Sequence, residues 1–298
     1  AFTGCTSLST ITIPKNVEHI GENTFDGCSA LTNIKWNVKQ LCDTCNDWSD
    51  SYWYGGWDGP EYYGYEIRTL FSDISKQITS FTFGDSVIYI PAGLCYGMDK
   101  VESITLPQSV EQIGGSAFVF CTALSNITLP QGLKTIGENA FVGCTALKSI
   151  RIPISVTDIG YGAFGWCSAL KAIELPEGIS SIKDNTFSHC SQLQTVKTPK
   201  SLEYIGDWAF IGCALLQSID IPEGVSSIGW SAFTGCKSLK HITIPSTVYW
   251  ISYSAFDDCK GITSIQWNPY GLDMADEEFV DGPFAAICKQ ITSITLGD

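Results

Sequence analysis

The chain has 298 residues, a formal net charge of −14 and 13 cysteines, with 44% hydrophobic and 16% charged residues. This balance excludes an acidic disordered tail, and 31 acidic against 17 basic residues argue against nucleic-acid binding, which needs a basic face. No run of about 18 apolar residues exists, so we expect no transmembrane segment, and the N-terminus from Ala1 to Cys5 lacks the basic and apolar regions of a signal peptide.

A 23-residue repeat organises the chain from its first cysteine, which we number position one of each unit. Leu or Ile falls at position four, Ile at seven, Ile or Leu at nine and Pro at ten. Val is common at thirteen, Ile holds sixteen, Gly is common at seventeen and Ala at twenty, and Phe holds twenty-one. A fixed period of this length is typical of a solenoid. The units begin at residues 5, 28, 75, 98, 121, 144, 167, 190, 213, 236, 259 and 288.

Three positions and two long units depart from this register. Ser75 and Met98 hold the cysteine position, whereas Cys95 stands where Phe belongs. The unit from residue 28 runs 47 residues and the unit from residue 259 runs 29, which indicates inserts at about 38–70 and 269–283. The sequence Lys-Gln-Ile-Thr-Ser from Lys76 recurs from Lys289, so a period of 213 residues overlies the short one. Because the chain opens and stops inside a unit, we expect it to be cut from a longer protein.

The repeat predicts one strand, one return and one corner in each unit. Leu-x-x-Ile-x-Ile alternates like a strand, and Pro ends it. Val-x-x-Ile-Gly brings the chain back, with Gly permitting a turn, and Ala-Phe-x-Gly-Cys forms a helical or 3₁₀ corner. One unit cannot bury its own apolar residues, so equivalent strands must pair in parallel between coils. We therefore predict a single solenoid over residues 1–298, in which about twelve coils span roughly 50–55 Å.

These recurring motifs resemble the BspA-like leucine-rich repeats, close to the treponemal class, of bacterial and trichomonad surface proteins. They cover nearly the whole chain apart from the two inserts. The resemblance implies a right-handed leucine-rich-repeat superhelix with a parallel β-sheet and short helical or 3₁₀ corners. It also implies a cell-surface or secreted protein whose usual role is adhesion or protein binding. The family has no common catalytic residues, so we expect neither an enzyme nor a cofactor.

The first insert carries two features that the repeat does not explain. Cys42 and Cys45 suggest a local disulfide or two free thiols rather than half a metal site, because no second Cys or His pair lies near in the sequence. Eight aromatic residues follow, interleaved with Asp, Glu and Gly. They suit sugar stacking or a protein hot spot, or they pack on the solenoid and hold the loop. These residues are Trp48, Tyr52, Trp53, Tyr54, Trp57, Tyr62, Tyr63 and Tyr65.

The cysteines at position one form a predicted column along the stack. Their spacing of about 5 Å would allow disulfides. Parallel stacking points every Cβ atom the same way, however, which suits disulfide geometry poorly. We therefore predict buried thiols that act as small hydrophobic groups, and no metal site.

Position eight faces outward on the predicted sheet and alternates in charge over four coils, through Arg151, Glu174, Lys197 and Asp220. Charged residues on stacked coils also occur in β-helix lyases. We favour cross-strand stabilisation over catalysis, because no His, paired carboxylate or metal set accompanies these residues.

A second aromatic group lies at positions 14 to 19 of three consecutive units. Stacking should bring these rings together beside the sheet, either as a partner surface or as packing between coils. The group contains Tyr204, Trp208, Trp230, Tyr249, Trp250 and Tyr253.

The sequence thus favours a non-catalytic protein that presents a solenoid surface to an extracellular protein or glycan. One alternative is a carbohydrate-binding or carbohydrate-processing module centred on the aromatic insert, and another is a structural spacer. Uncovered coils at both ends further predict end-to-end self-association, or stabilisation by flanking units.

Overall fold

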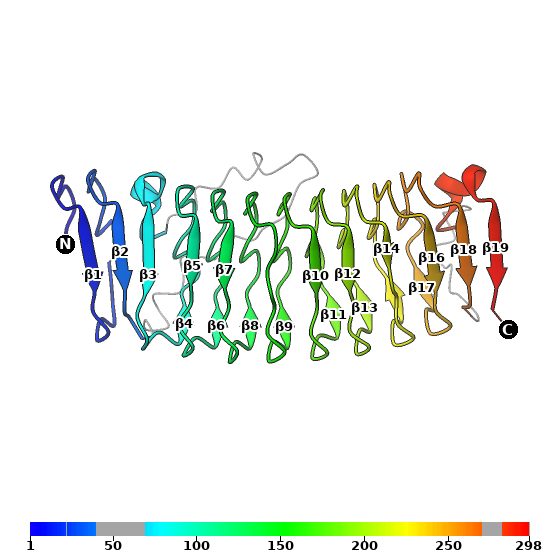
Figure 1. Ribbon diagram of the computed structural model, residues 1–298, viewed down its shortest axis with the longest axis horizontal. Coiled ribbons are helices and arrows are strands. Elements are labelled where there is room, and N and C mark those ends of the chain that lie inside the picture. The colour runs from blue at the N-terminus through cyan, green and yellow to red at the C-terminus, as the bar shows by residue number, and fades with distance from the viewer. Residues whose placement is uncertain (22, 40–68, 270–281, 298) are drawn as a thin grey trace.

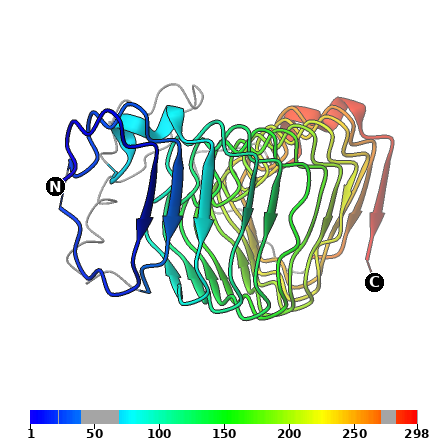
Figure 2. The same cartoon turned by 60° about the vertical axis from the view of Figure 1, so that its left-hand side comes forward.

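The structure is a computed structural model that describes residues 1–21, 23–39, 69–269 and 282–297. Successive coils stack side by side into an elongated body, with the N-terminal coil at one end and the C-terminal coil at the other (Figure 1). Figure 2 shows the coils following one another in parallel along the stack. The predicted parallel solenoid is confirmed.

The first row of strands holds positions six to nine of the units. Every pairing in the row is parallel and joins equivalent positions of neighbouring units. The strand register is maintained across both inserts, since Asn33 pairs with Ser80 and Ser264 pairs with Ser293. The row contains β1 (Thr10–Ile13), β2 (Asn33–Trp36), β3 (Ser80–Phe83), β5 (Ser103–Thr105), β7 (Asn126–Thr128), β10 (Ala172–Glu174), β12 (Thr195–Lys197), β14 (Ser218–Ile219), β16 (His241–Ile244), β18 (Ser264–Trp267) and β19 (Ser293–Leu296).

A second row of two-residue strands holds positions 15 and 16, where the chain returns. Its outer residue is at least partly exposed and its inner residue, always Ile, is buried. The row forms two four-stranded parallel sheets, β4-β6-β8-β9 and β11-β13-β15-β17. Its members are β4 (Tyr89–Ile90), β6 (Gln112–Ile113), β8 (Thr135–Ile136), β9 (Asp158–Ile159), β11 (Ser181–Ile182), β13 (Tyr204–Ile205), β15 (Ser227–Ile228) and β17 (Trp250–Ile251).

Of the alternating charges at position eight, one pair of side chains forms a direct ion pair. Lys197 on β12 forms an ion pair with Glu174 on β10, and its hydrogen bond lowers the pKa of Glu174. Arg151 lies in a segment without strand pairing, and within the described residues Asp220 has no ion pair. Arg151 adds a further charge interaction that also lowers the pKa of Glu174, so the cross-strand charge interaction predicted from the sequence is present around Glu174.

A column of phenylalanine rings fills the corner of the core. From the coil of Phe118 to the coil of Phe256, neighbouring ring centroids lie 5.2–5.7 Å apart and the rings are within 12° of parallel. These rings are fully buried, so each gains its packing from the coils on both sides. Cys95 takes the ring position in its own coil, as the register predicts.

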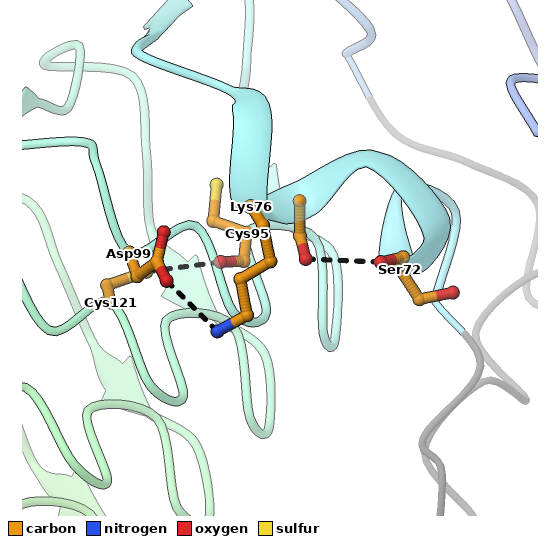
Figure 3. Close-up of polar contacts among 6 residues, drawn as sticks. Ser72, Lys76, Cys95, Asp99 and Cys121 are labelled. Carbon is orange, nitrogen blue, oxygen red and sulfur yellow. Dashed lines mark hydrogen bonds and ion pairs between the residues drawn. The ribbon is translucent and has the colours of Figure 1, made fainter. Parts of the chain in front are cut away.

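The cysteine column lies beside these rings, and its thiols are hydrogen-bond donors. The thiol of Cys144 donates to the carbonyl of Phe118 in the preceding coil at 3.2 Å, and Cys121 donates to the carbonyl of Cys95 at 3.1 Å (Figure 3). Eight thiols repeat this bond at 3.0–3.3 Å. The described cysteines are all free thiols, exposed only at Cys5 and Cys288 in the terminal coils. Buried thiols are thus confirmed, with a polar contact that the sequence did not reveal.

Glycine at position seventeen, where the sequence predicts a turn, allows close packing between coils. A Cβ atom on Gly137 would lie 2.6 Å from backbone atoms of Gly114 and Gly115 in the preceding coil. Its φ is not in the left-handed region. The left-handed residues instead fall at positions 19 and 23, for example Asn139 with φ 53° and Gly143 with φ 70°. They make most described corners tight turns rather than helices.

Among the corners that the structure describes, two are 3₁₀ helices, and they follow the two inserts. These are η4 (Ser72–Gln77) and η5 (Ala285–Gln290). In η4, the amide of Gln77 donates to the carbonyls of Cys28 and Leu31. In η5, the amide of Gln290 donates in the same way to Cys259 and Ile262. The long sequence period therefore corresponds to a repeated structural corner.

The last strand, β19, has all four residues exposed. Ile294 and Leu296 thus present an apolar strand edge of the kind that pairs with another strand. End-to-end association stays a prediction.

The thiol column predicts that the protein loses stability at alkaline pH. Burial raises the pKa of Cys121 and of Cys167 to about 12, whereas an unfolded thiol has a pKa of about 8.5. The stability that the buried, protonated thiols contribute is therefore fully present below about pH 8.5. It is lost as the pH rises above that value, because the unfolded chain releases thiol protons that the folded chain retains. We expect each such thiol to lower the free energy of unfolding by about 1.4 kcal/mol per pH unit above that value.

Urea unfolding followed by circular dichroism at pH 7.5 and pH 10 measures this effect. The double substitution Cys144→Ala/Cys167→Ala should show a shallower pH dependence, although it is less stable at pH 7.5. An equal urea midpoint at both pH values for the parent chain would contradict the account.

Candidate binding surface

The candidate site lies beside the second strand row, at positions 14 to 19 of the units from residue 144 to residue 258. Outside the first and last described coils, six large apolar side chains are exposed, and four of them lie here with exposed fractions between 37% and 58%. These four are Tyr161, Trp230, Tyr249 and Trp250. We call the whole region the lateral surface, and it contains Tyr161, Asp184, Tyr204, Asp207, Trp208, Trp230, Tyr249, Trp250 and Tyr253.

The residues at position 18 of successive units form a column along the lateral surface. Through successive coils this column reads Tyr161, Asp184, Asp207, Trp230 and Tyr253. Oδ1 of Asp184 accepts the backbone N–H of Asp207 at 2.9 Å, and Oδ1 of Asp207 accepts that of Trp230 at 2.6 Å. Each carboxylate thus fixes the next coil, and two acids are held between aromatic residues.

The predicted aromatic group is partly assembled by direct ring contact. The ring centroids of Trp208 and Trp230 lie 6.3 Å apart with planes tilted by 44°, and those of Trp230 and Tyr253 lie 6.2 Å apart at 74°. Trp208 has a φ of 54°, which is unusual for a bulky residue. The backbone N–H of Trp208 donates to the carbonyl of Trp230 at 2.7 Å, which ties this turn to the next coil.

Tyr204 and Trp250 share a row on the paired strands β13, β15 and β17. Ser227 separates them, since it pairs with Tyr204 on one side and with Trp250 on the other. Burial raises the pKa of Tyr204 to about 12, and the nearby charges of Asp184 and Asp207 add to the shift. The phenol therefore stays neutral beside two carboxylates.

At the N-terminal end of the lateral surface, the ammonium group of Lys183 lies next to both a carboxylate and an aromatic ring. Nζ of Lys183 lies 2.6 Å from Oδ1 of Asp158 and 5.5 Å from the ring centroid of Tyr161. This combines an ion pair with a cation–π contact. The lateral surface can therefore hold an ammonium group between a carboxylate and an aromatic ring.

The sequence pointed to the six aromatic residues of this region but missed Tyr161, Lys183, Asp184 and Asp207. The six aromatic residues lie in three consecutive units, whereas Tyr161 lies two units before Tyr204. Reading position 18 as a column through every unit would have found Tyr161 and both aspartates.

The other sequence-predicted site lies outside the described residues. It comprises Trp48, Tyr52, Trp53, Tyr54, Trp57, Tyr62 and Tyr63, together with Cys42 and Cys45. In the part of the chain that the structure describes, no three His, Cys, Asp or Glu residues are placed to share a metal ion. None of the helices in that part is both long and apolar enough to cross a membrane.

The model of the BspA type leucine rich repeat region matches residues 1–47, 68–173 and 157–279, in six copies. The chain belongs to this family. No curated protein matches the sequence.

Solved structures of other leucine-rich repeat proteins resemble this BspA-type chain at low sequence identity. One from T. pallidum has 23% identity and a TM-score of 0.48, covering 70% of this chain and 78% of its own. One from Bacteroides ovatus has 23% identity and a TM-score of 0.40, covering 100% and 86%. A leucine rich cell surface protein from Faecalibacterium prausnitzii has 23% identity and a TM-score of 0.40, covering 98% and 88%.

The carboxylate links in this BspA-type solenoid are testable through stability. Asp207→Ala removes the acceptor for the N–H of Trp230 and should lower the free energy of unfolding by about 1 kcal/mol. Asp207→Asn keeps an oxygen acceptor and should leave it nearly unchanged. Urea unfolding at pH 7 measures both, and equal losses in the two variants would show that the hydrogen bond is not what Asp207 contributes.

Proposed function

We propose that this chain is a non-catalytic binding protein, displayed on a cell surface or secreted, that presents its lateral surface to an extracellular protein. The observation that carries the proposal is the concentration of exposed rings on one side of the stack. Everywhere else between its terminal coils, the described solenoid leaves only two large apolar side chains exposed, Ile154 and Leu215.

Exposed aromatic residues on a rigid scaffold are characteristic of binding hot spots. Trp and Tyr bury a large area for a small loss of side-chain entropy, and they are enriched where alanine substitutions are most costly. Trp230 and Trp250 lie in adjacent coils whose backbones are fixed by strand pairing and by the carboxylate of Asp207. A partner would therefore meet rings that are already in place.

The extracellular location is supported by the BspA-type repeats, whose resemblance to surface proteins is the basis of this part of the proposal. Thirteen cysteines do not bear on it, since the described thiols form no disulfide and most are buried.

The proposal predicts a partner that depends on the lateral rings. Screening the chain by biolayer interferometry against extracellular matrix proteins, host surface proteins and glycans should identify a protein ligand. Trp230→Ala/Trp250→Ala should then weaken its binding at least tenfold, which is the scale of a hot spot.

A matched control removes two exposed apolar side chains away from the lateral surface, Ile154→Ala/Leu215→Ala. It should change the affinity less than twofold. Equal weakening by both double variants, or binding of glycans alone, would contradict the proposal.

A further inference from the structure

The two central carboxylates of the lateral surface are not paired with a cation inside the described part of the molecule. Asp184 and Asp207 each use Oδ1 for a backbone N–H, and neither forms an ion pair there. They lie in adjacent coils, and burial together with the charge of Asp207 raises the pKa of Asp184. Two half-buried acids side by side therefore favour the arrival of a positive charge.

The residues around these acids suit a cation with an apolar stem. Tyr161 precedes the two acids in the column, Trp230 follows them, and the phenol of Tyr204 lies close enough to feel both charges. An arginine side chain can stack its planar guanidinium on a ring while donating to a carboxylate, and its methylenes cover apolar surface. Lys183 shows this chemistry one coil away, with its ammonium between Asp158 and Tyr161.

Ring geometry distinguishes this ligand from a sugar chain. A glycan stacks best on rings that face it as one flat platform, whereas the planes of Trp208, Trp230 and Tyr253 are tilted by 44° and 74° between neighbours. Tilted rings do not offer that platform, whereas a guanidinium needs only one ring to stack on while it donates to a carboxylate. The net charge of −14 adds a long-range attraction for basic partners.

We propose that the lateral surface recognises an arginine-bearing extended segment of its protein partner, with guanidinium groups bound at Asp184 and Asp207 beside Tyr204 and Trp230. The inference rests on the proposed function, since it names the chemistry by which that surface holds a protein.

The test uses the intact chain and a defined probe, the capped peptide Ser-Arg-Ser-Arg-Ser-Arg-Ser, in isothermal titration calorimetry at pH 7 and 150 mM salt. The peptide should bind, and its counterpart with Glu in place of Arg should not. Asp184→Asn/Asp207→Asn should weaken binding of the arginine peptide at least tenfold. Asparagine keeps the oxygen that accepts each backbone N–H, so these variants should retain the fold.

The control, Glu174→Gln/Asp220→Asn, removes the same formal charge from the other strand row. It should change the affinity for the arginine peptide less than twofold. Equal weakening by both variants would show nonspecific attraction to a negative chain, and it would overturn the inference. Absence of arginine-peptide binding would overturn it as well.

The two proposals fail separately. If a protein partner loses affinity in Trp230→Ala/Trp250→Ala but binds Asp184→Asn/Asp207→Asn unchanged, the lateral surface binds without guanidinium recognition and only the inference falls. If the partner is indifferent to both variants, the proposed function falls too.

Discussion

Stacking of the coils in register is the constraint on which the rest of this structure depends. Phe rings at one position lie 5.2–5.7 Å apart through the regular coils, and beside them each thiol reaches a carbonyl of the coil before. At Gly137 the backbones approach so closely that a Cβ atom would lie 2.6 Å from its neighbours. A coil that slipped by one residue would lose all three contacts together. The interior therefore permits little variation from unit to unit.

The same register also positions the side chains on the outer surface of the solenoid, where a partner can bind. Outward positions are free of these contacts, but stacking still holds them in straight columns. Position 18 varies from Gly115 and Glu138 to Tyr161, Asp184 and Trp230 without disturbing the core. Where aromatic and acidic residues occupy neighbouring places in such a column, a binding surface arises with little rearrangement of the scaffold. The carboxylates of Asp184 and Asp207 serve both purposes, since each fixes the next coil and still adds charge to the surface.

Much of the fold could be predicted because the sequence repeats. One period gives the register, and the register gives every strand pairing, including the steps from Asn33 to Ser80 and from Ser264 to Ser293. Contacts between coils were harder to predict, since they depend on distances that no single unit reveals. The thiol bond of Cys144 and the crowding at Gly137 are of this kind. The aromatic group at Trp230 was visible as a cluster, but its acidic partners were not, because an Asp in a turn looks like an ordinary cap.

Hydrogen–deuterium exchange with the arginine peptide bound tests most directly whether this lateral column is the binding surface. The account predicts slower exchange in the amides of residues 181–185, 203–208 and 226–230, with the first strand row at residues 172–174, 195–197 and 218–220 unchanged. Protection confined to that first row would place the ligand on the other strand face and would contradict the account.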